Sequence, residues 1–186
     1  MQRVRMTAYA LAVLVFVWGV GTTVVRAQVR SQDGRIDLVD NCDPNTFPNG
    51  LCVVTAHPGD TTFAEFMALL FSPLSPTVVG HPAWRFEPSY VNARGNRGRL
   101  RVTNSGGEGH TFTEVPAFGG GFVSQLNGVG GPTGTSPLVP ADQCLNNPAV
   151  LAPGATVAIN LAPGLHNFQC CIHPWMRAVV DVEDED

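Results

Sequence analysis

The sequence predicts an all-β sandwich preceded by a segment that carries one short helix. Three observations favour this architecture. Short alternating segments separated by Gly- and Pro-rich turns occupy residues 81–182. A single amphipathic segment with a helix-start signal begins near residue 62. The last two expected strands enclose a loop rich in metal-binding side chains. We therefore expect residues 28–80 to form an N-terminal extension and residues 81–186 to form the β domain.

Residues 1–27 have the composition of a secretion signal. Arg3 and Arg5 precede an uncharged apolar run from Met6 to Val25, and Ala27 ends a cleavage site of the A-x-A kind. An uncleaved membrane anchor is the alternative, because the apolar run approaches the length that spans a bilayer. Cleavage predicts an exported protein, periplasmic or extracellular, with no stable membrane insertion afterwards. The absence of Lys favours a bacterial source with a GC-rich genome.

The charge balance is acidic and argues against nucleic acid as a partner. The chain has 15 Asp and Glu against 11 basic residues, all of them Arg. Removing residues 1–27 takes away three Arg, which leaves 8 Arg against 15 acids and a net charge of −7. Nucleic-acid affinity depends largely on neutralising phosphates with basic side chains, so we expect no nucleic-acid partner. The acidic end, residues 183–186, is most simply a solvated tail, with docking to a basic partner as the alternative.

One helix is expected, over residues 62–72. Thr62 and Glu65 have the spacing of a capping box. Apolar residues then recur at helical spacing, and Pro73 ends the segment; they are Phe63, Phe66, Met67 and Leu70. The helix could cover one side of the sandwich, offer a surface to a partner, or simply pack against the sandwich edge. Before it, residues 28–39 are expected to be loose and residues 40–60 to form a loop.

The β domain is predicted from short segments bounded by turn residues. A Pro is expected to kink the first strand or to place it at an edge. The expected strands are residues 83–91, 98–104, 110–115, 155–161, 165–170 and 177–182. Gly and Pro dominate residues 117–151, so we expect a long loop there without regular secondary structure.

The loop between the last two expected strands contains three metal-binding side chains. Cys170, His173 and Met176 fall within seven residues. A thiolate, an imidazole and a weak thioether make up most of a blue-copper site, whose trigonal core needs a second His. His110 begins an expected strand after a Gly-rich turn and can supply it. Buried Cys is also common in ordinary cores, and the vicinal pair with Cys171 could serve disulfide chemistry instead.

The stretch from Cys170 through His173, Pro174, Trp175 and Met176 resembles the C-terminal copper loop of the cupredoxins, the plastocyanin, azurin and amicyanin group. Its spacing is most similar to the short amicyanin-type loop. The resemblance covers roughly residues 82–116 and 152–182. It implies a cupredoxin-like Greek-key β-sandwich with one copper ion per chain. The implied metal ligands are His110, Cys170, His173 and Met176.

The resemblance also implies a function. Proteins of this kind are exported type 1 copper proteins that carry one electron and are not enzymes, and their partners are redox proteins bound transiently. It further implies that His173 is the exposed ligand, beside a surface patch of Pro174 and Trp175. Thr111 stands where the family usually has an Asn or Ser that braces the two ligand loops. The alternative is a copper-handling module without an electron-transfer role.

With Cys170 as a ligand, four cysteines remain, and export permits disulfides. Cys42 and Cys52 form the natural local pair, and a Cys144–Cys171 bridge would tie residues 117–151 to the copper loop. A free Cys171 stays possible. No ligand role is expected for the remaining histidines, which are His57, His81 and His166.

Overall fold

The computed structural model describes residues 34–70, 80–93, 98–127 and 138–183. The predicted signal segment, residues 1–27, lies outside the described residues. In the described part, no helix is both long enough and apolar enough to cross a bilayer.

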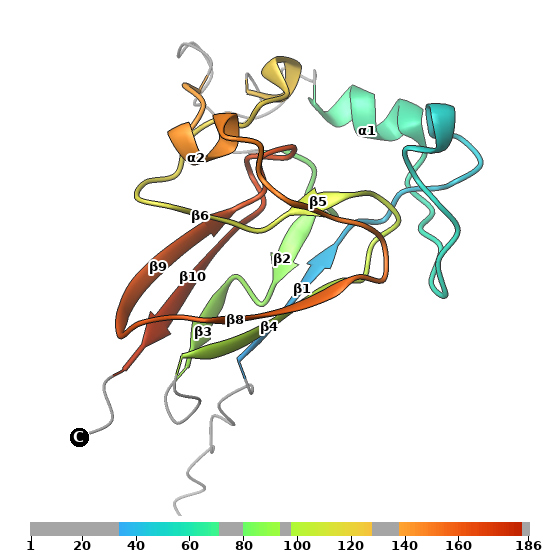
Figure 1. Cartoon of the computed structure of the whole chain (residues 1–186). Helices are drawn as coiled ribbons and strands as arrows, with labels where there is room; N and C mark the ends of the chain where they lie inside the picture. Colours follow the sequence, from blue (N-terminus) through green and yellow to red (C-terminus); the bar gives the residue numbers. More distant parts are fainter. Residues whose placement is uncertain (1–33, 71–79, 94–97, 128–137, 184–186) are drawn as a thin grey trace, which may run out of the picture.

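Two four-stranded sheets form the body of the molecule (Figure 1). The first sheet has the order β2 (Arg85–Glu87), β1 (Arg35–Val39), β4 (Arg99–Asn104), β8 (Thr156–Asn160). The second has the order β3 (Tyr90–Asn92), β10 (Arg177–Val182), β9 (Gly164–Gln169), β6 (Thr113–Val115). A short ladder joins β5 (His110–Thr111) to β7 (Val150–Leu151).

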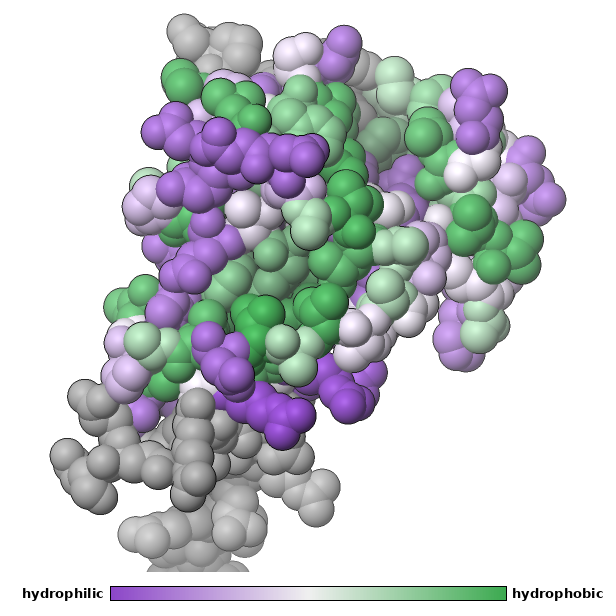
Figure 2. All heavy atoms as spheres, viewed as in Figure 1, coloured by the Kyte–Doolittle hydropathy of each residue, from purple (hydrophilic) through white to green (hydrophobic). Residues whose placement is uncertain are grey.

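The core lies between the sheets and follows from alternation along the strands. Every second residue of β1, β4 and β10 is buried; these residues are Ile36, Leu38, Leu100, Val102, Asn104, Ala178, Val180 and Val182. Figure 2 shows hydrophobic residues gathered in the middle of one face and hydrophilic residues along its margins. The predicted all-β sandwich is confirmed.

The expectation that residues 28–39 are loose is wrong for Arg35–Val39. This segment forms β1, which pairs with β2 on one side and runs parallel to β4 on the other. Ile36 and Leu38 are fully buried, whereas Arg35 and Asp37 form an ion pair at 3.0 Å on the other face. The two apolar residues are therefore enough to place the strand inside the sheet, despite its polar appearance.

The expected strand over residues 83–91 is divided between the two sheets. β2 ends at Glu87 and β3 begins at Tyr90, with a cis peptide bond between Glu87 and Pro88. The expected strand over residues 110–115 is likewise interrupted, since β5 ends at Thr111 and β6 begins at Thr113. Both divisions let the chain pass from one part of the sandwich to another.

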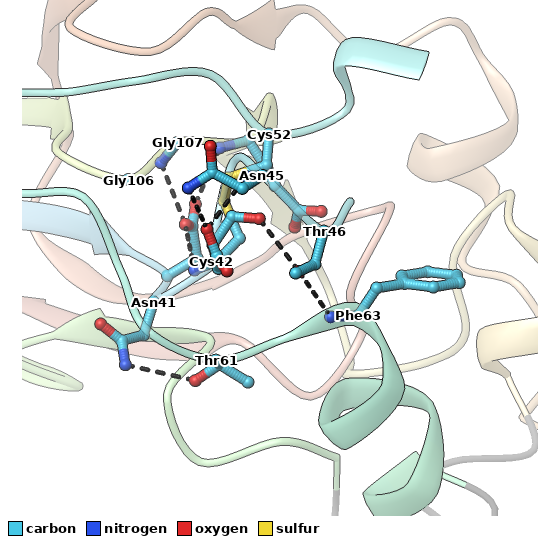
Figure 3. Close-up of a disulfide and its surroundings, with 12 residues drawn as sticks. Asn41, Cys42, Asn45, Thr46, Cys52, Thr61, Phe63, Gly106 and Gly107 are labelled. Carbon is cyan, nitrogen blue, oxygen red and sulfur yellow. Dashed lines mark hydrogen bonds between the residues drawn. A yellow bond between two sulfur atoms is a disulfide. The ribbon is translucent and has the colours of Figure 1, made fainter. Parts of the chain in front are cut away.

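Helix α1 (Phe63–Leu70) confirms the predicted helix, with residues 71–72 lying outside the described part. The capping box is formed: Glu65 N donates to Thr62 Oγ1 at 3.2 Å, and Thr62 N donates to Glu65 Oε2 at 2.8 Å. Thr46 Oγ1 accepts a further bond from Phe63 N at 3.1 Å, which attaches the helix start to the loop before it (Figure 3).

Residues 117–151 are not a purely irregular loop, contrary to expectation. They contain a 3-10 turn (η2, Ser124–Leu126), the short helix α2 (Asp142–Leu145) and strand β7. A second 3-10 turn, η1 (Pro48–Gly50), precedes α1. The sequence did not predict α2 and β7 because tertiary contacts define them: α2 carries the buried Cys144, and β7 pairs with β5. In Figure 1, α1 and α2 lie at the same end of the sandwich as the loop that joins β9 to β10.

Candidate metal centre

Three of the predicted ligands meet in one buried cluster. His110, Cys170 and His173 each direct one ligand atom into a group whose members lie within 4.8 Å of one another. Cys170 Sγ is 3.9 Å from His110 Nδ1 and 4.0 Å from His173 Nδ1. His110 and Cys170 are fully buried and His173 is 4% exposed. The cluster is therefore closed to bulk water.

The β9–β10 connection positions two of these side chains. Cys170 follows the last residue of β9, and its N–H donates to Met176 O at 3.0 Å. Met176 N in turn donates to His173 O at 2.9 Å, which closes a tight loop. Met176 itself is fully buried. The fourth predicted ligand thus lies inside the molecule on the same short loop.

His110 reaches the cluster from the other side, at the start of β5. It pairs with Leu151 of β7. Asn104, the last residue of β4, fixes the turn before it by donating to Glu108 O at 2.7 Å and to Leu151 O at 2.8 Å. The turn and the ladder together hold His110 opposite Cys170.

The surroundings of Cys170 favour a thiolate. Thr111 N and His173 N both donate to its Sγ at 3.5 Å. Burial opposes ionisation, but hydrogen bonds and charge from His110 and His173 hold the pKa of Cys170 well below its ordinary value. Burial also opposes protonation of His110, yet its bonds to Asp40 and Cys170 raise its pKa to about 9. A thiolate is the form of cysteine that binds metals.

Thr111 joins the two ligand-bearing segments, as its place in the sequence predicts. Its Oγ1 accepts a hydrogen bond from Cys171 N at 2.7 Å, and both groups are buried. The segment that contains His110 is therefore attached to the residue next to Cys170.

The expectation that His173 is exposed beside a Pro174–Trp175 surface is wrong. Pro174 is fully buried and Trp175 is partly buried. Phe66 of α1 lies over this region, with its ring centroid 6.3 Å from that of His173. The helix of the N-terminal segment therefore covers the side of the cluster that was expected to face solvent.

Two carboxylates that the sequence analysis did not single out lie behind the imidazoles. Asp40 Oδ2 is 2.8 Å from His110 Nε2, and Glu108 Oε2 is 3.4 Å from His173 Nε2. Burial raises the pKa of Asp40, but bonds from His110 and from backbone N–H groups outweigh it and lower the pKa. Burial raises the pKa of Glu108 despite the opposing effect of His173. For Glu108, the sequence offered one signal: it is a single acid between two glycines, two residues before the predicted ligand His110.

Both expected disulfides are present. Cys42 bonds to Cys52, and Cys144 bonds to Cys171, while Cys170 is in no disulfide. In Figure 3 the Cys42–Cys52 bridge lies beside Gly106 and Gly107. These two glycines belong to the turn that precedes His110. Two disulfides fit an exported protein.

The remaining histidines are not members of the cluster. His57 is exposed, and the His81 ring packs against Trp84 with centroids 4.8 Å apart. His166 contacts Glu114 at 2.7 Å. None of the three belongs to a group of described side chains that could hold a metal ion.

No protein-family model and no curated protein matches the chain. Among solved structures it is similar to a purple cupredoxin from Nitrosopumilus maritimus, with 14% identity and a TM-score of 0.35, over 81% of this chain and 100% of the other. It is also similar to a copper-containing nitrite reductase from Thermus scotoductus SA-01, with 16% identity and a TM-score of 0.32, over 55% of this chain and 21% of the other. Similarities with such low sequence identities and TM-scores do not indicate a function for this chain.

Proposed function

We propose that the chain is an exported type 1 copper protein that carries one electron between redox partners. One observation carries the proposal: His110, Cys170 and His173 are buried together, each with one ligand atom in a group whose members lie within 4.8 Å of one another. A copper ion held there would supply a one-electron couple between Cu(II) and Cu(I).

The donor set fits copper. Metal–nitrogen and metal–sulfur bonds of about 2.0–2.3 Å bring two ligands of one ion to within about 4 Å of each other, and the Sγ–Nδ1 separations here are 3.9 and 4.0 Å. One thiolate and two imidazoles with a thioether nearby is the blue-copper combination. A structural zinc site would instead use four firm N, S or O ligands. His110, Cys170 and His173 would hold the single ion, and Met176 would be the weak fourth ligand.

Burial of the donor atoms supports a carrier rather than an enzyme. His110, Cys170 and Met176 are fully buried and His173 nearly so, so a substrate would have no route to the metal without movement of the chain. The two ligand segments are attached to each other through Thr111 and the backbone of Cys171. A fixed ligand frame suits a couple whose two states prefer different geometries.

Reconstitution with Cu(II) tests the proposal. The purified protein should develop an intense thiolate-to-copper band and narrow copper hyperfine splitting in its spin-resonance spectrum, and Cys170→Ser should lose both. His57→Gln is the matched control, because His57 is exposed and lies outside the cluster; it should behave as the wild type.

Two other outcomes would decide against the electron carrier. A pale protein that still binds one copper ion per chain would favour copper handling without electron transfer. A protein that binds no copper would show that the ligand assignment itself is wrong. Potentiometry of the blue protein should show a reversible one-electron couple if the protein is an electron carrier.

A further inference from the structure

Each imidazole of the cluster lies between a thiolate and a carboxylate. Both rings turn Nδ1 toward Cys170. Their far nitrogens face acids: His110 Nε2 is 2.8 Å from Asp40, and His173 Nε2 is 3.4 Å from Glu108. The acid side chains are 1% and 10% exposed. An ionised carboxylate only accepts hydrogen bonds, so His110 donates from Nε2 to Asp40, and its Nδ1 is the nitrogen left to bind a metal ion in the cluster. Glu108 approaches His173 Nε2 at the longer distance of an ion pair.

Asp40 is fixed in a backbone cradle. Its Oδ1 accepts from Gly107 N at 2.9 Å and Cys42 N at 3.3 Å, and its Oδ2 accepts from Glu108 N at 3.0 Å. A Cβ on Gly106 would lie 2.0 Å from Asp40 Oδ2, so the turn can close over the carboxylate only with glycine there. The aspartate therefore has one orientation, with one remaining acceptor position aimed at His110.

Glu108 is fixed by a buried indole. Trp84 Nε1 donates to the same Oε2 that faces His173, and Trp84 is 1% exposed. The indole thus holds this oxygen beside His173 Nε2, while burial raises the pKa of Glu108. Because Glu108 shares its oxygen and lies farther from its imidazole, its influence on the cluster should be weaker than that of Asp40.

We infer that Asp40 and Glu108 are positioning residues that orient the two metal-binding imidazoles and favour the oxidised over the reduced state of the bound copper. The inference rests on the proposed copper function. Negative charge behind the ligands, chiefly that of Asp40, stabilises the more positive Cu(II) ion more than Cu(I). A carboxylate partner also makes an imidazole a stronger ligand for the metal. The carboxylates thus oppose the thioether of Met176, which favours Cu(I).

The test compares Asp40→Asn and Glu108→Gln with the wild type in the full chain. Cu(II) and Cu(I) affinities are measured separately by chelator competition, and the reduction potential by spectroelectrochemistry. Loss of such a partner typically weakens metal binding about 10–100-fold. Asp40→Asn should weaken Cu(II) binding by that order and Cu(I) binding less, so the potential rises. Each tenfold change in the affinity ratio corresponds to about 59 mV for one electron.

Glu108→Gln should shift the ratio in the same direction by a smaller factor. Asp37→Asn is the matched control, since it removes an acid from the adjacent β1 strand that is paired with Arg35 at 3.0 Å, outside the cluster. It should leave the affinity ratio unchanged. A purely structural role for the two acids would weaken Cu(I) and Cu(II) binding equally and leave the potential in place.

The outcomes separate this inference from the proposed function. If the wild type shows the thiolate-to-copper band while neither variant shifts the affinity ratio, the inference is overturned and the copper function stands. If the wild type lacks the band, the proposed function itself fails. Should Asp40→Asn fail to fold, as judged by circular dichroism, the Glu108→Gln result alone decides the inference.

Discussion

Thr111 contacts both cysteines of the vicinal pair. Its N–H donates to Cys170 Sγ at 3.5 Å, and its Oγ1 accepts from Cys171 N at 2.7 Å. The residue is fully buried, so no water replaces either bond if it is lost. The backbone and side chain of this one residue thereby link the segment of His110 to the loop of Cys170 and His173.

Replacing Thr111 with Val should destabilise the protein. The two side chains have nearly the same shape, but Val leaves Cys171 N–H buried without an acceptor, at about 1–3 kcal/mol. Thr111→Ser keeps the hydroxyl and should lose much less. Urea unfolding of the metal-free proteins gives both values. Equal stabilities for the Val and Ser variants would show that the hydroxyl does not brace the two segments.

The sequence predicted that His110, Cys170 and His173 lie together, but it did not predict the two carboxylates, for a physical reason. Cys170, His173 and Met176 lie within one tight loop, so their spacing alone restricts where they point. Asp40 reaches His110 across 70 residues of sequence, through a parallel pairing of β1 with β4 that no local pattern indicates. Contacts of that kind depend on how the sheets assemble, and the alternation of β1 was too short to reveal it.

The start of helix α1 depends on neighbouring residues, whereas its position in the fold depends on residues far away in the sequence. Its start was predictable because the Thr62–Glu65 capping box involves neighbouring residues only. Its position was not, since Phe66 packs on Trp84 with ring centroids 4.6 Å apart and approaches His173 from another part of the chain. The covered face of the cluster is thus a consequence of tertiary aromatic packing.

The pairing of β6 with β9 has a pH-dependent contact. His166 on β9 donates to Glu114 Oε1 of β6 at 2.7 Å and to Ala162 O at 2.8 Å when both ring nitrogens are protonated. The bond to Glu114 raises the pKa of His166 above its ordinary value, against a smaller effect of burial. The contact lies on the strand pair that leads into the Cys170 loop.

The stability contributed by this contact should fall as pH rises. A group with a raised folded pKa stabilises fully below its unfolded pKa, about 6.5 for His, and loses that effect as pH passes its folded pKa. The effect should be below about 1 kcal/mol, because Glu114 is exposed. Urea unfolding of the metal-free protein from mildly acidic to mildly alkaline pH measures it against Glu114→Gln. The difference between the two profiles should shrink toward high pH; a constant difference would contradict the pairing.

At the scale of the whole molecule, the two disulfides support opposite sides of the cluster. Cys171 is adjacent to Cys170 and ties the ligand loop to α2 through Cys144. The other bridge lies under the turn before His110: a Cβ on Gly107 would lie 2.7 Å from Cys42 Sγ and 3.0 Å from Cys52 Sγ. Each covalent link therefore restrains a segment that carries one or more of the predicted ligands.

Removing the bridges in turn should have unequal effects. Cys144 and Cys171 are 27 residues apart and Cys42 and Cys52 are 10 apart. In the chain-entropy treatment, the longer closed loop contributes about 3–4 kcal/mol and the shorter about 2.5–3 kcal/mol. The paired Ser variants, Cys144→Ser with Cys171→Ser and Cys42→Ser with Cys52→Ser, should follow this order in urea unfolding.

Copper retention against a chelator distinguishes a local from a general effect of the same variants. Loss of the Cys144–Cys171 bridge should speed copper release more than its stability change alone accounts for, because it frees the residue next to the Cys170 thiolate. Loss of the Cys42–Cys52 bridge acts on the cradle of Asp40, whose Oδ1 accepts from Cys42 N at 3.3 Å. It should therefore shift the Cu(II)-to-Cu(I) affinity ratio toward Cu(I), as Asp40→Asn does. If both pairs of variants release copper in proportion to lost stability and leave that ratio unchanged, the bridges stabilise the sandwich as a whole and have no specific effect on the metal centre.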